Sequence, residues 1–259
     1  MEEISYPSLR MDGQVALVTG ASRGLGKWIA MGLARTGAEV VVVSRNLAGS
    51  EETAHEISKF DGRALALEAD VGDIEAIKRM VAQTLDHFGR LDCLVNNAGT
   101  NVRKPVLEVT PEDFDAVSRV NFRAVYFASQ IAAREMIPRG GGRIINISSS
   151  AGYLIRPKIA NSVYAGTKAA VIMLTKAFAE ELAPYHINVN AVAPGYFATP
   201  LAKDRLDDPK IRESILSMTP LNQIGAPQDI IGPVLFLASE ASRFMTGQTI
   251  FVDGGRSIL

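Results

Sequence analysis

Residues 15–44, VALVTGASRGLGKWIAMGLARTGAEVVVVS, hold three patterned segments joined by glycine-containing turns. VALVT (15–19) and EVVVVS (39–44) are short runs rich in β-branched residues, which is the pattern of buried strands. GLGKWIAMGLART (24–36) has apolar residues at helical spacing and is followed by Gly37, a residue type that commonly ends helices. The stretch therefore predicts a strand–helix–strand unit with two parallel strands.

The same alternation of short apolar runs and longer amphipathic segments continues along the chain. Near-continuous apolar strands that alternate with helices are typical of a parallel sheet covered on both faces. No linker, repeat or low-complexity segment divides the sequence, so we expect one α/β domain over residues 1–259. We expect further strands at 63–70, 91–96, 142–148, 187–193 and 248–252, and further helices at about 47–60, 73–89, 111–136, 163–184 and 227–239.

One segment departs from the alternation. Residues 196–220, YFATPLAKDRLDDPKIRESILSMTP, are rich in charge and follow Pro194-Gly195 at the end of an expected strand. In open parallel sheets, ligands bind beyond the carboxyl ends of the strands, and long insertions there often carry function. We therefore expect a substrate-loop insertion at about 196–220.

Composition excludes several classes of function. The 27 lysines and arginines balance 28 aspartates and glutamates, which gives no electrostatic basis for binding nucleic acid or an anionic membrane. The acidic start MEEISYPSLRMDG lacks the apolar core of a secretory signal, and no apolar run approaches the length of a membrane span. We therefore expect a cytoplasmic protein.

The single cysteine and the three histidines indicate neither a disulfide nor a metal site. Cys93 lies in the apolar run LDCLV and is expected in the core, because free cysteines are often buried. His55, His87 and His186 are scattered along the chain without the spacing of metal ligands. We expect no metal.

The turn TGASRGLG (19–26) joins the first expected strand to the first expected helix. Glycines let the backbone turn tightly and approach a ligand closely, and a helix N-terminus favours phosphate. A P-loop is ruled out because Ala21 stands where its first glycine is needed and Trp28 follows Lys27. The turn therefore indicates a dinucleotide phosphate site, with a purely structural connection as the alternative.

The residues that end the second strand bear on which dinucleotide would bind. An acidic residue there binds a ribose 2′-hydroxyl and repels a 2′-phosphate. This chain has Ser44, Arg45 and Asn46 instead, together with Arg23 in the glycine turn. Two guanidinium groups and a hydroxyl suit a phosphate, so we predict NADP rather than NAD. The alternative is that both arginines are solvated surface charges.

Tyr164 and Lys168 are four residues apart, a spacing that places them on one face of a helix. An ammonium group near a phenol lowers the pKa of the phenol, which makes tyrosine usable as a general acid or base near neutral pH. The pair gains weight because its helix follows GRIINIS (142–148), an expected strand that ends in serines. Tyr153 lacks such support, since Pro157 stands four residues further on.

With these motifs in view, the chain resembles the short-chain dehydrogenase/reductase family over about residues 11–255. The motifs that carry the resemblance occur in order: TGASRGLG at 19–26, Asp70-Val71, NNAG at 96–99, Asn121, the serines at 148–150, Tyr164 with Lys168, and Pro194-Gly195 with Thr199. The resemblance implies a single-domain, doubly wound (Rossmann) parallel sheet of about seven strands with helices on both faces. It also implies an NADP(H)-dependent oxidoreductase that interconverts a ketone and a secondary alcohol by hydride transfer.

The resemblance further implies roles for individual residues. Tyr164 would exchange a proton with the reacting oxygen. Lys168 would hold the nicotinamide ribose and lower the Tyr164 pKa, and Asn121 would hold a water that links Lys168 to solvent. Asp70 would bind adenine, although an aspartate at this position could instead cap the next helix. The implied cofactor-binding residues are Gly20, Ser22, Arg23, Gly24, Leu25, Gly26, Ser44, Arg45, Asn46, Asp70, Val71, Asn97, Ala98, Gly99, Tyr164, Lys168, Pro194, Gly195, Phe197 and Thr199.

One of the three serines would hydrogen-bond the reacting oxygen. In the family the strand usually ends in a pair of hydroxyls, and the second of them is catalytic, which selects Ser149. Counting back from Tyr164 by the usual family spacing reaches Ala151 instead, which has no hydroxyl, so the loop at 153–162 is longer than is typical. We predict Ser149, with Ser150 as the alternative, because the strand fixes the register better than the loop does.

The substrate is less well defined by the sequence. Tyr153, Arg103, Arg156 and Lys158 are candidates for substrate contact, and the cations would suit a carboxylate or phosphate; solvated loop charges are the alternative. Several segments resemble those of gluconate 5-dehydrogenases, which act on sugar acids, and those of 3-oxoacyl carrier-protein reductases. We expect a sugar keto acid or another small carbonyl compound, with a 3-oxoacyl thioester as the alternative.

Two further expectations come with the resemblance. Some proteins of this fold bind dinucleotide without catalysis, as sensors or scaffolds, but such relatives tend to lose the tyrosine or the lysine, and this chain has both. Relatives are mostly homotetramers that pair through the long helices and the C-terminal strand region. The apolar stretch AAVIMLTKAFA (169–179) is compatible with such a subunit interface.

Overall fold

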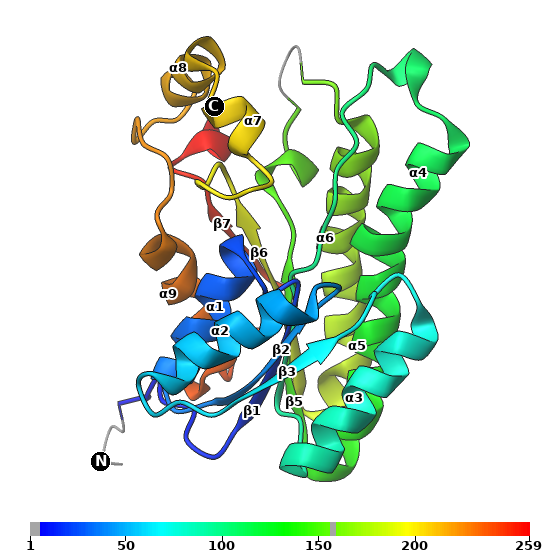
Figure 1. Ribbon diagram of the computed structural model, residues 1–259, viewed down its shortest axis with the longest axis vertical. Coiled ribbons are helices and arrows are strands. Elements are labelled where there is room, and N and C mark those ends of the chain that lie inside the picture. The colour runs from blue at the N-terminus through cyan, green and yellow to red at the C-terminus, as the bar shows by residue number, and fades with distance from the viewer. Residues whose placement is uncertain (1–5, 156–158) are drawn as a thin grey trace.

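The computed structural model describes residues 6–155 and 159–259, and within these ranges seven strands form one parallel sheet in the order β3-β2-β1-β4-β5-β6-β7 (Figure 1). The strands are β1 (Val15–Thr19), β2 (Glu39–Ser44), β3 (Ala64–Glu68), β4 (Cys93–Asn96), β5 (Gly142–Ile147), β6 (Ile187–Pro194) and β7 (Thr249–Val252). The helices are α1 (Gly24–Arg35), α2 (Leu47–Ser58), α3 (Ile74–Phe88), α4 (Pro111–Ser118), α5 (Ala124–Met136), α6 (Ser162–Leu182), α7 (Lys203–Leu206), α8 (Pro209–Ser217) and α9 (Pro227–Ala238). The predicted α/β class and doubly wound sheet are confirmed.

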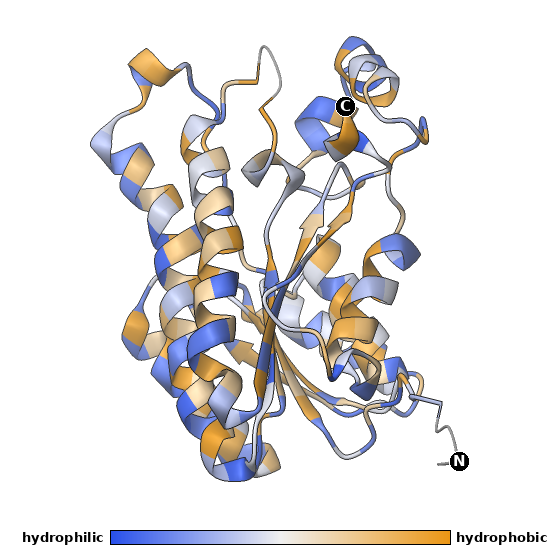
Figure 2. Ribbon diagram, turned by 180° about the vertical axis from the view of Figure 1, so that it is seen from behind, coloured by the Kyte–Doolittle hydropathy of each residue, from blue (hydrophilic) through white to orange (hydrophobic). Residues whose placement is uncertain are grey.

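Alternate residues of each central strand serve opposite faces of the sheet, as the two-residue repeat of a strand requires. Val15 and Leu17 of β1 pack in a core with residues of α3, α5 and α6. Ala16 and Val18 pack in a second core with residues of α1, α2 and α9. Figure 1 shows these two groups of helices on opposite sides of the sheet, and Figure 2 shows the strands between them in hydrophobic colours.

The order of the strands reverses at β1. The chain runs outward from β1 through β2 to β3, and then returns to place β4 on the other side of β1, where Ala16 pairs with Cys93. Such a reversal leaves a crevice at the carboxyl ends of the two strands, because their connections leave in opposite directions. The fold therefore places its natural ligand site where the glycine turn after β1 meets the segment after β4.

Helices α4 and α5 form the long helix that the sequence predicts at about 111–136, but they are joined by one π-helical turn, Arg119–Arg123. Thr110 begins the helix with a capping box that involves Asp113, and Pro111 occupies the first turn as predicted. Asn121 lies within the π-helical turn. Turns of this kind are rare and often occur at functional sites.

The segment 196–220 contains the short helices α7 and α8, and it lies beside the C-terminus above the ends of β6 and β7 (Figure 1). Cys93 is fully buried in β4, and burial raises the pKa of its thiol to about 12, as expected for a core cysteine. Across the part of the chain that the structure describes, every helix is too short or too polar to cross a membrane.

Candidate active site

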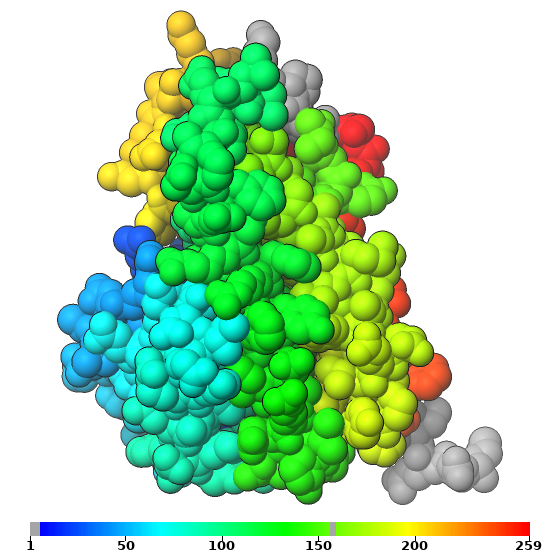
Figure 3. Space-filling model, turned by 90° about the vertical axis from the view of Figure 1, so that its right-hand side faces the viewer, coloured from blue at the N-terminus to red at the C-terminus, as the bar shows by residue number. Residues whose placement is uncertain are grey.

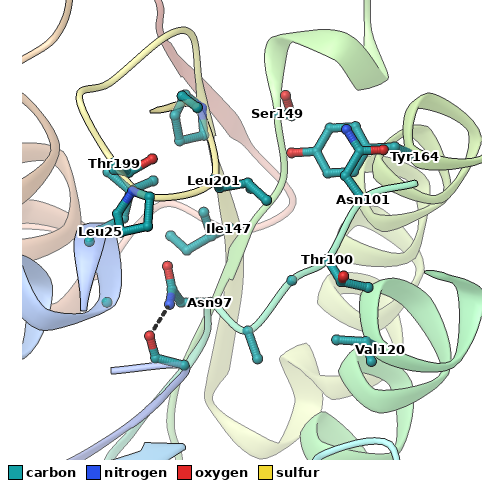
Figure 4. A pocket seen from close by; sticks show the side chains of 18 of the residues that line it. Leu25, Asn97, Thr100, Asn101, Val120, Ile147, Ser149, Tyr164, Thr199 and Leu201 are labelled. Atoms are coloured by element: carbon teal, nitrogen blue, oxygen red, sulfur yellow. Dashed lines mark hydrogen bonds between the residues drawn. The ribbon is translucent and has the colours of Figure 1, made fainter. Parts of the chain in front are cut away.

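A cleft of about 990 Å³ opens at the carboxyl ends of the strands (Figure 4). It is bounded by the glycine turn, the segment after β4, the end of β5, the first turns of α6 and the segment after β6. All the predicted cofactor-binding residues line it: Gly20, Ser22, Arg23, Gly24, Leu25, Gly26, Ser44, Arg45, Asn46, Asp70, Val71, Asn97, Ala98, Gly99, Tyr164, Lys168, Pro194, Gly195, Phe197 and Thr199. The fold thus brings together residues that lie far apart in the sequence.

The glycine turn is held against the segment after β4 by close packing. The Asn97 side-chain amide donates to the carbonyl oxygens of Thr19 at 2.8 Å and of Gly20 at 3.1 Å. A Cβ at Gly26 would overlap both the Gly20 carbonyl oxygen and Asn97 Nδ2, so this position accepts only glycine without a shift of the turn. The packing fixes the N-terminus of α1 at the cleft, where its backbone N–H groups can receive phosphate.

The end of β2 carries positive charge into the same cleft. The Ser44 hydroxyl is engaged within its own turn, where it donates to the Asn46 carbonyl at 2.9 Å and accepts from the Asn46 amide at 3.1 Å. The Arg23 and Arg45 side chains are exposed and line the cleft beside that turn. Glu52 lines the cleft as well, but its carboxylate lies 3.3 Å from the Lys27 ammonium, which offsets its charge.

Asp70 is not the cap of the helix that follows it. The N-cap of α3 is Asp73, whose side chain accepts from the Glu75 amide at 3.0 Å. The Asp70 carboxylate instead accepts from the Gly72 amide at 2.9 Å and lies 3.7 Å from the Arg119 guanidinium. Asp70 therefore faces the cleft, and the capping alternative for it does not hold.

The three serines after β5 face three different surroundings. Ser148 is buried, and its hydroxyl donates to the Lys168 carbonyl at 2.8 Å, which ties the end of β5 to α6. Ser149 forms a side-chain hydrogen bond with Tyr164, and its oxygen also accepts from the Ala151 amide at 3.1 Å. Ser150 begins a 3-10 turn and is buried. Figure 4 shows the Ser149 and Tyr164 hydroxyls on the same side of the cleft.

The pKa of Tyr164 is raised above its ordinary value, which is opposite to the expected direction. Burial of the phenol is the largest cause, and the hydrogen bond with Ser149 and the positive charge of Arg103 lower the pKa by less. Tyr196, which also lines the cleft, raises it slightly further. The sequence-based expectation was wrong in direction because it considered a neighbouring charge and not the loss of solvent.

Lys168 does not supply the expected charge at the Tyr164 hydroxyl in this structure. Its ammonium donates to the Ile147 carbonyl at 2.7 Å and lies 5.8 Å from the centre of the Tyr164 ring. Burial lowers the pKa of Lys168 to about 8, so a fraction of this amine is neutral at mildly alkaline pH. Lys168 is thus a buried amine poised to exchange protons.

Asn121 lies behind the cleft and not on its lining. Its side-chain amide makes a two-point contact with the backbone of Thr100, accepting from the amide at 2.8 Å and donating to the carbonyl at 2.9 Å. A third hydrogen bond, at 3.2 Å, reaches the Thr167 hydroxyl on α6. A Cβ at Gly99 would stand 3.5 Å from Asn121 Oδ1 and 3.7 Å from Lys168 Nζ, so all three groups meet at one place.

The predicted substrate residues are only partly brought to the cleft. Arg103 lines it, and its guanidinium donates to the Leu201 carbonyl in the 196–220 segment at 3.0 Å. Tyr153 does not line it: the side chain is 66% exposed and its ring lies 5.0 Å from that of Phe251. Arg156 and Lys158 lie outside the described residues.

Tyr196 and Arg256 are among the cleft residues that the sequence reasoning missed. Tyr196 follows Pro194-Gly195 directly, and its position between that motif and Phe197 is a signal that could have found it. Arg256 comes from the far C-terminal end of the chain and reaches the cleft only through the fold. Its one sequence signal is a charged residue between a glycine pair and a final apolar stretch.

Comparison with known proteins agrees with this geometry. Residues 20–257 match the family model described as enoyl-(acyl carrier protein) reductase. The chain is 41% identical over 257 residues to a gluconate 5-dehydrogenase of Gluconobacter oxydans, covering 98% of this chain and 99% of the relative. It is 40% identical over 247 residues to a 3-oxoacyl-[acyl-carrier-protein] reductase of Synechocystis, covering 95% and 97%.

A solved structure of a related dehydrogenase is similar to this chain over almost its whole length. The crystal structure of a gluconate 5-dehydrogenase from Burkholderia cenocepacia in complex with NADP and tartrate superposes with a TM-score of 0.92. The two sequences are 40% identical, and the match covers 97% of this chain and 98% of that one.

The contact between Ser149 and Tyr164 predicts how the phenol titrates. Because this hydrogen bond lowers the Tyr164 pKa, Ser149→Ala should raise that pKa further. The measurement is an NMR titration of ring-labelled tyrosine, with the Tyr164 signal assigned by its loss in Tyr164→Phe. Ser150→Ala is the matched control and should leave the titration unchanged. An unchanged Tyr164 pKa in Ser149→Ala would show that the two hydroxyls are not coupled.

Proposed function

The chain belongs to the short-chain dehydrogenase/reductase family of oxidoreductases, and we propose that it interconverts a ketone and a secondary alcohol with NADP(H). The observation that carries this proposal is the Tyr164 hydroxyl, hydrogen-bonded to Ser149 in the same cleft that the glycine turn closes at its other end. One cleft thus offers a place for a dinucleotide and a proton donor beside it.

The chemistry divides between the cofactor and the residues of this chain. When bound, NADPH supplies the hydride. Tyr164 donates its proton to the carbonyl oxygen of the substrate, while the Ser149 hydroxyl holds that oxygen in place. The raised pKa keeps Tyr164 protonated at neutral pH, which suits its role as acid in the direction of reduction. In the direction of oxidation the same group must first lose its proton, so the rate of alcohol oxidation should rise at alkaline pH.

Lys168 and Asn121 assist the exchange of protons at Tyr164. Lys168 is buried on α6 one turn after Tyr164, and its pKa of about 8 allows it to give up and regain a proton near neutral pH. Asn121 holds the Thr100 backbone, and with it the segment after β4 that borders Lys168. We assign Lys168 to the return of a proton to Tyr164, and Asn121 to the support of that route.

The residues of the cleft fit an NADP-type dinucleotide. Because Gly26 lacks a Cβ, the first turn of α1 packs directly on the glycine turn and Asn97, and the N-terminus of α1 faces the cleft. Arg23 and Arg45 stand where a 2′-phosphate would lie, and no carboxylate ends β2 to repel it. The Burkholderia gluconate 5-dehydrogenase was crystallised with NADP, which supports the same choice here.

A sugar keto acid or another small carbonyl compound is the favoured substrate. The Gluconobacter relative is named for gluconate, and the Burkholderia structure holds tartrate, a hydroxy acid. Arg103, which lines the cleft and acts on Tyr164, is placed to receive a carboxylate near the reacting carbonyl. A 3-oxoacyl thioester is the second candidate, because the Synechocystis relative is similar over nearly its whole length.

We also propose a homotetramer in the cytoplasm. Figure 3 shows the face formed by α3, α4, α5 and α6. An apolar groove of about 670 Å³ on this face is lined by residues that include Phe114 and Val163, and a second copy of the chain would cover it. Light scattering should give four chains per particle, and Phe114→Asp should lower that mass. A monomeric wild-type protein would refute the assembly.

The reaction itself is tested with a panel of substrates and two tyrosine variants. With NADPH, the wild-type protein should reduce keto acids of sugar size. Tyr164→Phe should lower kcat by about 10²- to 10⁴-fold, the usual contribution of a general acid, with little change in NADPH affinity. Tyr153→Phe, which changes a tyrosine outside the cleft, should retain activity.

Three outcomes would contradict parts of this proposal. Turnover retained in Tyr164→Phe would reject the role of Tyr164 as the general acid. Reduction of acyl thioesters only would reject the sugar-acid substrate. NADPH binding without turnover of any carbonyl compound would favour a non-catalytic sensor or scaffold.

The choice of cofactor depends on Arg23 and Arg45. A charge-assisted hydrogen bond is worth about 1.5–3 kcal/mol, so Arg45→Gln or Arg23→Gln should lower kcat/KM for NADPH by about tenfold or more. The values for NADH should change little, because NADH has no 2′-phosphate. Lys59→Gln, which removes an exposed cation at the far end of α2, serves as the control. A wild-type preference for NADH would be incompatible with the assignment.

A further inference from the structure

Arg256 is buried to an unusual degree for an arginine. Its side chain is only 2% exposed, although it stands three residues from the C-terminus and borders the cleft. Arginine is almost never fully buried unless it is paired, because the charged group loses its hydration. The contacts that compensate for this loss therefore indicate what the side chain does.

The contacts of Arg256 reach both ends of the 196–220 segment. Its guanidinium donates to the Ile215 carbonyl in α8 at 3.1 Å and contacts the Thr219 hydroxyl at 3.4 Å. The Thr219 hydroxyl itself donates to the Ile215 carbonyl at 2.7 Å, which closes a compact cluster. At the other end of the segment, the guanidinium carbon lies 5.1 Å from the centre of the Tyr196 ring, a cation–π contact.

The backbone just before Arg256 also packs on the end of the 196–220 segment. Gly254 and Gly255 have positive φ angles of 66° and 85°, and a Cβ on Gly254 would stand 2.7 Å from the Thr219 side chain. The Leu221 amide donates to the Gly254 carbonyl at 3.0 Å. The turn that carries Arg256 is therefore packed directly on the end of the 196–220 segment.

We propose that Arg256 is a positioning residue, which clamps Tyr196 and the end of α8 and so fixes the substrate side of the cleft. In the middle of the segment, between the two clamped ends, four more residues line the cleft: Leu201, Ala202, Asp204 and Arg205. Loss of the clamp leaves the dinucleotide side of the cleft intact, because the clamping contacts involve neither the glycine turn nor the end of β2. The kinetic effect of the clamp rests on the proposed function.

The test compares Arg256→Met with Arg243→Met, which alters an exposed arginine in the same part of the chain. Arg256→Met should raise KM for the carbonyl substrate by about tenfold or more, the effect of losing roughly 1.4 kcal/mol of binding, while Kd for NADPH changes less than about twofold. Arg256→Lys keeps the charge but not the planar guanidinium, so its KM for the substrate should lie between the values of the wild-type protein and Arg256→Met. An unchanged substrate KM in folded Arg256→Met would overturn the proposal.

Variants of Tyr196 test the other end of the clamp. Tyr196→Leu removes the ring and should raise KM for the substrate as Arg256→Met does. Tyr196→Phe keeps the ring and should raise KM by a smaller factor. The double variant Arg256→Met with Tyr196→Leu should raise KM by less than the product of the two single effects, because both substitutions remove the contact between the guanidinium and the Tyr196 ring. Additive losses would overturn the clamp. If Arg256→Met does not fold, KM for the substrate is measured in Thr219→Val, Tyr196→Leu and Tyr196→Phe instead. Thr219→Val and Tyr196→Leu should raise it, and an unchanged KM in both would overturn the clamp.

Two measurements distinguish a clamp from direct binding of the substrate by Arg256. A loss in Arg256→Met that is confined to anionic substrates would indicate that the guanidinium binds the substrate charge, and it would overturn the positioning role. Hydrogen exchange needs no turnover: amides of α8 and of residues 201–206 should exchange faster in Arg256→Met, with β1 to β5 unchanged. Unchanged exchange would refute the clamp, even if the wild-type protein proved inactive and the proposed function failed.

Discussion

The packing of Gly26 against the Gly20 carbonyl and the Asn97 amide is the constraint on which the rest of the site depends. It joins the turn after β1 to the segment after β4 at the point where the order of the strands reverses. Because Gly26 lacks a Cβ, the first turn of α1 can lie directly on that segment. The N-terminus of α1 is thereby aimed at the cleft, and Gly99 is held beside Lys168 and Asn121.

A second set of buried polar contacts places Ser149 and Tyr164 relative to this turn. Asn96 in β4 donates to Asn146 in β5 at 2.9 Å, and Asn146 donates to Thr175 in α6 at 3.0 Å. Buried polar groups of this kind are stable only when each finds its partner, so they specify one alignment of the strands and α6. That alignment brings Tyr164 to Ser149, which neither strand nor helix could do alone.

The sequence predicted the secondary structure and the contents of the cleft well, because both depend on local patterns. Apolar runs marked the strands. The strand register selected Ser149 as the catalytic serine, which stays a prediction; the structure places Ser149 beside Tyr164. The direction of the Tyr164 pKa was wrong, because spacing along a helix shows a neighbouring charge but not the loss of solvent. The role of Arg256 depends on contacts with Tyr196 and Ile215, which are distant in sequence, so no local pattern could have revealed it.

The central claim is that the cleft carries out hydride transfer from NADPH to a carbonyl carbon. Reduction of a sugar keto acid with NADPH that carries two deuterium atoms at C4 of the nicotinamide tests it most directly, with the product analysed by mass spectrometry. We predict a product alcohol that carries one deuterium on the former carbonyl carbon, formed about 10²- to 10⁴-fold more slowly when Tyr164→Phe replaces the wild-type protein. A product without deuterium, or no product from any carbonyl compound despite NADPH binding, would contradict the claim.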